Sequence, residues 1–433
     1  MIPQIELASS EEITAFQEQK LLETLAYVWE NSPFYKRFFT EKNVDISEIR
    51  TLADLHKLPL TTKEDLQKYN DDFICVPNNK IIDYAATSGT LGEPVTFGLT
   101  DADLERLAYN EAISFDCAGI KEGDTVQLMT TIDRRFMAGM AYFLGLRKMK
   151  VGMIRVGAGI PELQWDSILK HRPTYLIAVP SFLLKLIEYA EAHNIDYNNS
   201  GIKGAICIGE ALRNEDFSNN TLGRKITEKW NIKLFSTYAS TEMSTAFTEC
   251  SHGKGGHHHP ELIIVEALDD DGNPVADGEP GELTFTTLGI EAMPLIRFKT
   301  GDIVQLHRDH CECGRKTLRV GPVIGRKQQM IKYKGTTLYP PAMNDVLNDF
   351  ENIESYIIVI STNELGMDEI CIKLAVREQS DDFLREIKDH FRAKLRVTPK
   401  IEFTSKTVLY PLIYNPMSRK PIHFFDKRTS GNL

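Results

Sequence analysis

Apolar residues recur along the chain first at helical spacing and then in short, strand-like runs. Between Phe16 and Phe39 they fall three or four residues apart, which predicts an amphipathic helix. Leu58–Leu66 predicts a short helix, because Thr61 or Thr62 can cap it and acidic residues occupy its first turn. The clearest runs that follow are a helix over Pro180–Ala192 and strands over Thr125–Met129, Lys150–Val156, Tyr175–Val179 and Ala205–Ile208. Such alternation is typical of an α/β domain with a largely parallel sheet.

The pattern changes after about Glu261. Strand-like runs separated by turn residues predict antiparallel pairing of Glu261–Leu268, Gly281–Thr286 and Asp302–His307. A smaller unit follows Arg326, with helices over Pro340–Phe350 and Asp381–Leu395 and strands over Tyr356–Ser361, Glu369–Arg377 and Lys400–Thr404. We therefore expect a large N-terminal α/β domain with parallel sheets and a β-rich subdomain over residues 1–325. A small C-terminal α+β domain should occupy residues 326–433.

Length and charge narrow the class of protein. A chain of 433 residues is too long for one ordinary core, so two or three domains are expected. The formal net charge of -11 argues against a nucleic-acid-binding surface. No apolar run reaches the roughly 18–20 residues of a membrane span, and the acidic N-terminal segment lacks a signal-peptide core, so we expect a cytoplasmic protein. Seven scattered cysteines do not indicate a disulfide framework.

Four segments carry residues suited to nucleotide chemistry. Residues 87–94 read TSGTLGEP, a flexible loop whose N–H groups and hydroxyls can surround a polyphosphate, although plain turns share this composition. Residues 236–242 read STYASTE, in which a tyrosine can stack on a purine and a carboxylate can hold Mg²⁺. In IRFKTGD, residues 296–302, Asp302 can accept hydrogen bonds from both ribose hydroxyls. The basic segment 324–335, IGRKQQMIKYKG, indicates on its own a charged hinge.

The order and spacing of these segments resemble the phenylacetate–CoA ligase family of the adenylate-forming superfamily, from about Tyr27 to Arg428. The matching motifs are NSPFYKRFF, LPLTTKEDL, TSGTLGEP, VPSF, IGEAL, YASTE, FKTGD and IGRKQQMIKYKG. The resemblance implies an enzyme that joins a carboxylic acid to ATP with release of pyrophosphate. The acyl group of the adenylate then passes to coenzyme A and AMP leaves. A mobile C-terminal lid is also implied and, since family members are often dimers, a homodimer.

The resemblance assigns a role to each matching position. Thr241 would touch the α-phosphate, Glu242 would bind Mg²⁺, and Lys420 in PMSRKPIHFFDKR would be the mobile catalytic lysine. The other nucleotide-binding positions would be Ser88, Gly89 and Thr90 at the β- and γ-phosphates, Gly209, Glu210, Ala211, Tyr238, Ala239 and Ser240 near the adenine, and Asp302 and Arg326 at the ribose. Rotation of the small domain about its hinge would then bring Lys332 and Gly335 to the pantetheine tunnel in place of Lys420.

Charge that develops during the reaction explains why such groups are needed. When a carboxylate attacks the α-phosphate, negative charge accumulates over several oxygens. Mg²⁺ and a positioned ammonium group stabilise that charge better in the transition state than in the ground state. Loss of one such group typically lowers the rate by roughly 10²–10³-fold.

A second, independent signal is a metal-binding pattern. Cys311–Glu312–Cys313–Gly314 has the spacing of a metal knuckle, and thiolates with imidazole suit tetrahedral Zn²⁺. Zinc-bearing members of the family have a similar layout, whereas the alternative is a set of chance cysteines beside a surface histidine run. Four of six residues would hold a structural zinc, drawn from Cys250, His252, His257, His258, Cys311 and Cys313. The spacing leaves the fourth ligand open between His257 and His258.

Three positions depart from the family pattern in the nucleotide motifs. Glu93 stands where the phosphate loop usually has lysine, Gln328 where the hinge usually has aspartate, and Arg419 where a glycine usually precedes the catalytic lysine. Glu93 places a negative charge near phosphates. Gln328 gives the hinge a different hydrogen-bonding partner, and Arg419 weakens the motif match that identifies Lys420.

The acyl pocket is the most divergent part of the resemblance. Phe136, Ala138 and Gly139 could line an aromatic pocket, so phenylacetate or a related aryl acid is the default substrate. The charged segment 133–135 could either solvate a surface loop or contact a polar acyl group.

Other functions compete with the ligase interpretation. The enzyme could load a carrier-protein thiol instead of coenzyme A. A nucleotide- or CoA-binding sensor that has lost catalysis is the alternative suggested by Glu93, Gln328 and Arg419. A zinc-stapled interaction module would leave the nucleotide motifs unexplained.

Overall fold

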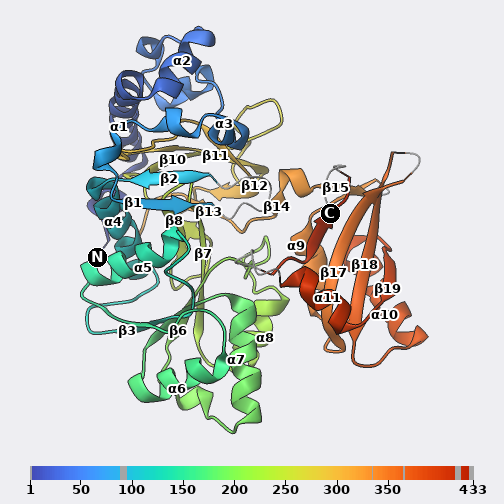
Figure 1. The fold of residues 1–433 in the computed structure, drawn as a ribbon. Coiled ribbons are helices and arrows are strands. Elements are labelled where there is room, and N and C mark those ends of the chain that lie inside the picture. Colours follow the sequence, from blue (N-terminus) through green and yellow to red (C-terminus); the bar gives the residue numbers. More distant parts are fainter. Residues whose placement is uncertain (1, 88–94, 334, 364–365, 415–420, 429–433) are drawn as a thin grey trace. The chain divides into compact units, whose positions relative to one another are not determined.

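The computed structural model describes residues 2–87, 95–333, 335–363, 366–414 and 421–428. The chain forms two compact units, one made of Met1–Asn219 and Gly223–Val323 and the other of Asn220–Leu222 and Ile324–Leu433. Figure 1 shows the course of the chain through both units. Among the described residues, no helix combines the length and apolar character that crossing a membrane requires.

Helices dominate the first part of the chain. The α-helices before residue 230 are α1 (Ser10–Asn31), α2 (Pro33–Glu41), α3 (Lys63–Lys68), α4 (Asp101–Cys117), α5 (Met137–Lys148), α6 (Pro161–His171), α7 (Pro180–Ala192) and α8 (Thr221–Lys229). Short 3₁₀ helices are η1 (Gln4–Leu7), η2 (Ile46–Glu48), η3 (Leu52–Lys57), η4 (Asn70–Phe73), η5 (Asn78–Lys80) and η6 (Tyr197–Asn199). The helix predicted over Pro180–Ala192 is confirmed as α7.

The N-terminal amphipathic stretch forms two helices, so the single helix predicted between Phe16 and Phe39 is wrong at its centre. The side chain of Ser32 accepts a hydrogen bond from the backbone of Tyr35 and caps α2, and Pro33 occupies the first turn. Proline lacks an N–H group and clashes with the preceding turn, so α1 ends before it. The short helix predicted next is confirmed as α3, which Thr62 caps.

One large sheet spans the first unit. In spatial order its strands are β10 (Ile263–Leu268), β11 (Pro280–Thr287), β12 (Phe298–His307), β13 (Arg319–Val320), β9 (Gly256–His257), β8 (Thr245–Glu249), β7 (Lys233–Ser240), β6 (Gly204–Cys207), β5 (Tyr175–Ala178), β3 (Thr125–Leu128) and β4 (Gly152–Arg155). From β7 to β4 the neighbours are parallel, whereas from β7 to β10 they are antiparallel. The predicted parallel and β-rich parts therefore form one continuous sheet, and β7 belongs to both.

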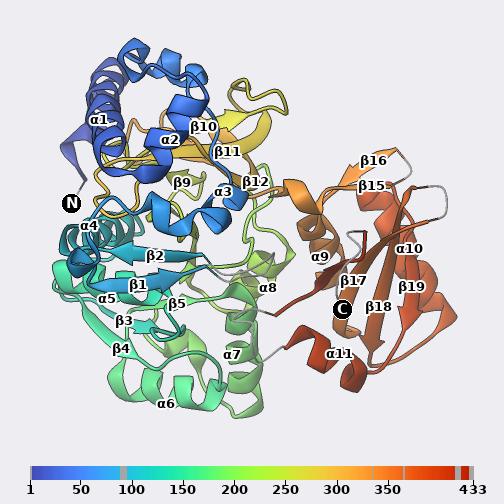
Figure 2. The ribbon, with the colours of Figure 1, turned by 45° about the horizontal axis from the view of Figure 1, so that its top comes forward.

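Helices cover the parallel part of this sheet. All four residues of β5 are buried, as expected for a parallel strand covered on both faces. Figures 1 and 2 both show α6 and α7 side by side, and Trp165 of α6 donates a hydrogen bond of 2.9 Å to the Leu186 carbonyl of α7. A separate antiparallel hairpin consists of β1 (Asp83–Ala86) and β2 (Thr96–Leu99).

The second unit is a small α+β module. Its elements are β14 (Gly325–Arg326), η7 (Lys327–Gln329), β15 (Ile331–Tyr333), β16 (Thr336–Leu338), α9 (Pro340–Asn348), β17 (Ile353–Thr362), β18 (Asp368–Val376), α10 (Asp381–Leu395), β19 (Lys400–Phe403), α11 (Lys406–Ile413) and β20 (Phe424–Asp426). Its main sheet has the order β19, β18, β17, β20. Alternate residues of β17 face opposite ways: Ile358 packs into the core with α9 and α10, and Ile357 packs with Leu409 of α11.

Candidate functional site

The predicted adenine-binding segments lie at the carboxyl ends of neighbouring parallel strands. β5, β6 and β7 are adjacent and parallel, so their carboxyl ends lie at the same edge of the sheet. Val179 follows β5, residues 209–211 follow β6, and Tyr238, Ala239 and Ser240 end β7. Ligands of open α/β sheets bind outside such strand ends. The pairing also changes here from parallel to antiparallel, because β8 returns beside β7.

A tight turn after β7 carries the two residues expected to handle the α-phosphate and Mg²⁺. Thr241 and Glu242 are both half-buried in this turn. Ser244 closes it, donating from its backbone N–H and its hydroxyl to the Thr241 carbonyl, at 3.3 and 3.2 Å. The φ of Ser244 is 45°, a left-handed conformation that costs a non-glycine residue free energy. The surrounding structure therefore has to hold this turn in place.

A hydrogen bond joins the expected adenine and ribose segments. The hydroxyl of Tyr238 donates to Oδ2 of Asp302 at 2.7 Å, although the two residues are 64 positions apart. Asp302 lies in β12, where its backbone N–H donates to the Thr300 hydroxyl at 3.0 Å. On its other side the Tyr238 ring stacks with Phe247 of β8, with 6.1 Å between the ring centroids. The Tyr238 ring and the Asp302 carboxylate are thus fixed relative to each other.

The segment after β6 is shaped by Gly209 and Glu210. Gly209 has φ 79°, which glycine adopts without strain. The carboxylate of Glu210 accepts hydrogen bonds from the backbone N–H and the hydroxyl of Ser181, at 2.9 and 2.8 Å. Ser181 lies in the first turn of α7, where a negative charge is stabilised. Glu210 therefore anchors α7, a role that the sequence pattern did not reveal, and exposed Ala211 follows it.

The residues expected to line the acyl pocket begin α5. Gly139 allows a close approach, because a Cβ atom there would lie 2.2 Å from the Thr131 carbonyl oxygen. Phe136 and Ala138 are half-buried, and the loop before them is tied to β1 by a 2.9 Å hydrogen bond from Ala86 N–H to the Arg135 carbonyl. The charged residues 133–135 are exposed, which favours the solvated-loop interpretation for them.

Several expected site residues lie in the second unit. Arg326 belongs to β14 and Lys332 to β15, and Gly335 has φ 84° in the turn that follows. The backbone N–H of Lys332 donates to Asp368 at 2.8 Å, and the same carboxylate pairs with Arg428 at 2.9 Å. Ser88, Gly89, Thr90, Glu93, Arg419 and Lys420 lie outside the described residues.

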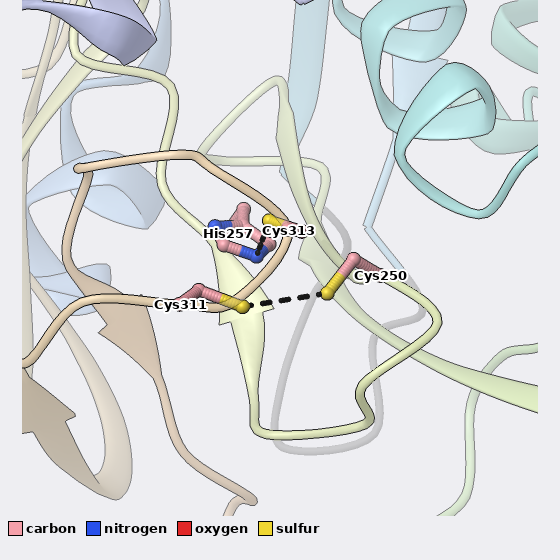
Figure 3. Close-up of side chains that lie close together, drawn as sticks. All are labelled: Cys250, His257, Cys311 and Cys313. Carbon is pink, nitrogen blue, oxygen red and sulfur yellow. Dashed lines mark hydrogen bonds between the residues drawn. The ribbon is translucent and has the colours of Figure 1, made fainter.

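Four of the six candidate metal ligands come together in one group. The ligand atoms of Cys250, His257, Cys311 and Cys313 all lie within 4.8 Å of one another. Figure 3 shows them converging from the loop after β8, from β9 and from the loop after β12. The Sγ atoms of Cys250 and Cys311 are 3.6 Å apart, and Cys313 Sγ is 3.4 Å from His257 Nε2. Hydrogen bonds from Cys250 and from His257 lower the pKa of Cys313 far below that of an ordinary thiol.

The other two candidate histidines lie outside this group. His258 is buried with its Nε2 2.6 Å from the Ile263 carbonyl oxygen, and burial lowers its pKa to about 4. His252 instead lies 3.4 Å from the Glu312 carboxylate. β9 ends at His257, and the ring of the next residue, His258, is held at the Ile263 carbonyl, so of the two histidines it is His257 that faces the cysteines.

A buried ionic network supports the metal-ligand group from behind. Glu6 of η1 accepts from Arg315 Nε at 2.8 Å and lies 2.5 Å from His259 Nδ1. Arg315 also donates to Cys313 Sγ at 3.7 Å. Burial raises the pKa of Glu6, but His259 and Arg315 outweigh it and hold that pKa below its usual value. Sequence patterns missed this network, because Glu6 and Arg315 are 309 positions apart.

Known proteins resemble this chain in sequence and in fold. Residues 44–291 match the AMP-binding enzyme family. The phenylacetate-coenzyme A ligase of Thermus thermophilus is 30% identical over 390 residues, covering 89% of this chain and 85% of that protein. The phenylacetate-coenzyme A ligase of Escherichia coli is 29% identical, covering 87% and 85%. A crystal structure of 2-hydroxyisobutyryl-CoA ligase in the postadenylation state, in complex with an adenylate, superposes with a TM-score of 0.85 at 25% identity, covering 98% of this chain and 92% of that chain.

Proposed function

Because the chain belongs to the AMP-binding enzyme family and is an ATP-dependent acid–CoA ligase that works through an acyl-adenylate, we propose that this chemistry takes place at the carboxyl ends of β5, β6 and β7. The hydrogen bond between Tyr238 and Asp302 carries the proposal. It joins the segment expected at the adenine to the one expected at the ribose. Tyr238 also lies only three residues before Thr241 in the sequence. A nucleotide bound there has its α-phosphate at the Thr241–Ser244 turn.

In the first half-reaction a carboxylate oxygen of the acid attacks the α-phosphorus of ATP. A new oxygen–phosphorus bond forms, and the bond to the bridging oxygen breaks to release pyrophosphate. Thr241 contacts the α-phosphate, and the carboxylate of Glu242 suits Mg²⁺, which prefers oxygen ligands. Mg²⁺ would neutralise charge on the phosphates. By their motif matches, Ser88, Gly89 and Thr90 hold the β- and γ-phosphates and Lys420 stabilises the developing charge.

In the second half-reaction the thiol of coenzyme A attacks the acyl carbon. The carbon–sulfur bond forms, the bond to the phosphate oxygen breaks, and AMP leaves. We assign the second unit the role of a mobile lid, with Arg326 at the ribose and Lys332 and Gly335 beside the pantetheine arm. The left-handed conformation of Gly335 supports a tight turn at this loop.

The acid is an aryl acid of the phenylacetate type in this proposal. The relatives from Thermus thermophilus and Escherichia coli act on phenylacetate by name, and half-buried Phe136 offers an aromatic wall. The 2-hydroxyisobutyryl-CoA ligase makes a short branched 2-hydroxy acid the second candidate. A larger aromatic acid and a small hydroxy acid differ enough in size and polarity for one panel of substrates to separate them.

Cys250, His257, Cys311 and Cys313 fit a structural zinc ion. With zinc–sulfur bonds near 2.3 Å, ligand atoms at the corners of a tetrahedron are separated by roughly 3.5–3.8 Å. The observed separations of 3.6 and 3.4 Å agree with this, and all four corners are filled by protein atoms. Thr317 Oγ1, 3.5 Å from His257 Nδ1, orients the imidazole so that Nε2 faces the cysteines. Zinc would tie the loop after β8 to the loop after β12.

The test is a pyrophosphate-release assay over aryl and short-chain 2-hydroxy acids, each with and without coenzyme A. We expect one acid to give ATP- and Mg²⁺-dependent release that falls roughly 10²–10³-fold in Lys420→Ala. Release that needs a carrier protein instead of coenzyme A would move the reaction to the carrier-loading alternative. Absence of turnover with every acid, with ATP and coenzyme A still bound, would favour the sensor and make Glu93→Lys the next variant.

A further inference from the structure

Helix α4 presents a polar face to the start of β8. Arg106 and Asn110 lie one helical turn apart on this face. The Oδ1 atom of Asn110 accepts a hydrogen bond of 3.0 Å from the backbone N–H of Ala246. Arg106 donates to the Ser244 carbonyl at 2.7 Å and to the Thr245 hydroxyl at 3.2 Å. Three successive residues of β8 and its preceding turn are therefore held by α4.

The remaining hydrogen bonds of Arg106 tie this turn to the sheet. Its guanidinium donates to the carbonyl of Leu262, just before β10, at 2.6 Å, and to the carbonyl of Leu288, just after β11, at 2.8 Å. Desolvation lowers the pKa of Arg106 to about 10, so its charge is kept at a cost. Hydrophobic packing alone would not require a charged side chain at this position. A planar guanidinium, in contrast, can donate hydrogen bonds to several carbonyls at once.

The contact with Ser244 bears directly on the turn. Ser244 has the left-handed φ of 45°, and both its N–H and its hydroxyl reach back to the Thr241 carbonyl. A strained residue persists only where its surroundings over-determine it. Arg106 binds the Ser244 carbonyl on the other side of the same residue. Release of that carbonyl would let Ser244 relax and shift Thr241 and Glu242 with it.

We propose that Arg106 is a positioning residue for adenylation, which fixes the Thr241–Ser244 turn so that Thr241 and Glu242 meet the α-phosphate and its Mg²⁺. The proposal rests on the function proposed above for those two residues. A displacement of about 1 Å in such a group can lower a rate by roughly 100-fold. Arg106 itself touches no reacting atom and acts only through the turn.

The experiment compares Arg106→Lys with Asp103→Asn in ATP–pyrophosphate exchange and in thermal unfolding. Asp103 is buried on the same helix and accepts from the backbone N–H groups of Glu291 and Ala292, at 2.7 and 3.0 Å, away from the turn. We expect Arg106→Lys to lower kcat by about 10–100-fold with KM for the acid within about threefold. Asp103→Asn should lower the unfolding temperature while kcat stays within about twofold of the wild type.

Two further readouts separate positioning from stability. The double variant Arg106→Lys/Glu242→Gln should be no slower than Glu242→Gln alone, because both changes act on one group. By calorimetry, the gain in ATP affinity on addition of Mg²⁺ should shrink in Arg106→Lys. If Arg106→Lys does not fold, Thr245→Val can be used instead. It removes one of the groups that accept a hydrogen bond from Arg106 and should still lower kcat by about 3–10-fold.

The outcomes distinguish this inference from the proposed function. If Glu242→Gln lowers exchange while Arg106→Lys and Thr245→Val leave kcat unchanged, only the positioning role of Arg106 is overturned. Multiplicative losses in the double variant would overturn it equally. If Glu242→Gln itself exchanges pyrophosphate at the wild-type rate, the proposed role of the turn fails and the inference falls with it.

Discussion

The two ends of the β7–β8 hairpin carry polar groups that are held in place in different ways. At one end the Thr241–Ser244 turn is held from outside, by Arg106 of α4, in a strained conformation. At the other end Cys250 belongs to a group of four donors that lie within 4.8 Å of one another. The turn carries residues proposed to meet a reacting ligand, and a neighbouring helix fixes it. The four donors instead face one another, and the buried Glu6–Arg315 pair reaches them through Cys313.

The largest effect should come from the metal end of the hairpin. His257→Asn removes one of the four proposed zinc ligands and should abolish zinc binding, lowering the free energy of unfolding by about 5 kcal/mol or more. Metal analysis and denaturant unfolding check this. The matched control is His258→Asn, which changes the next residue along the chain. This variant should retain zinc. Loss of zinc from His258→Asn with retention in His257→Asn would reverse the assignment.

At the other end, activity should be lost without loss of the fold. Glu242→Gln keeps the shape of the half-buried side chain but removes the charge that suits Mg²⁺. Pyrophosphate exchange should fall by roughly 10²–10³-fold, equivalent to about 3–4 kcal/mol. The unfolding temperature should stay within about 2 °C of the wild type, and the zinc content should not change. A variant that loses zinc would contradict the separate roles of the two ends.

Helix α4, which holds the Thr241–Ser244 turn, contains a buried carboxyl group whose effect on stability should depend on pH. Burial raises the pKa of Glu111 to about 8 from its usual value of 4.5. Between these values the folded state binds more protons than the unfolded state, so stability falls as pH rises from about 5 to 8. Glu111→Gln removes this dependence and should be more stable than the wild type by about 2–4 kcal/mol at pH 8.

The measurement for Glu111 is urea unfolding of both proteins at pH 5.5 and pH 8. The difference between variant and wild type should grow with pH. An equal difference at the two pH values would show that Glu111 is ionised in the folded protein or exposed to solvent. The pyrophosphate exchange of the variant checks separately that α4 still holds the turn.

The smallest effect should come from Glu210. Its carboxylate accepts two hydrogen bonds from Ser181 at the start of α7. Glu210→Gln retains one acceptor and loses the charge, so stability should fall by about 1 kcal/mol. If Glu210 serves α7 and only the backbone of this segment lines the adenine, KM for ATP should stay within about twofold. A tenfold rise in KM would give the side chain a direct role at the nucleotide.

The sequence predicted the α/β fold well where local signals agree. Apolar runs located β3, β5 and β6, and Pro180 marked the start of α7. The break between α1 and α2 was missed because the apolar spacing continues through Pro33, although the proline itself was a visible signal. Three-residue β20 carries too few positions for any periodicity to show, and its register with β17 depends on tertiary pairing.

The residues of the candidate site also differ in whether the sequence could predict them. Motif order placed Tyr238 and Asp302 in one site, and the structure joins them by a hydrogen bond. The choice of His257 over His258 needed the tertiary structure, in which His257 Nε2 lies beside Cys313 and His258 Nε2 beside the Ile263 carbonyl, since residue spacing fits both. The roles of Arg106 and Glu6 depend on partners more than a hundred positions away, which no local pattern records.

The most direct test of the account is ATP–pyrophosphate exchange with the best acid of the panel, measured for Glu242→Gln and His257→Asn together with zinc content. We predict that Glu242→Gln keeps one zinc ion per chain and loses at least about 100-fold in exchange. His257→Asn should lose its zinc, and the fraction that remains folded should exchange at close to the wild-type rate. Wild-type exchange by Glu242→Gln, with zinc still bound, would contradict the assignment of adenylation to this end of the hairpin.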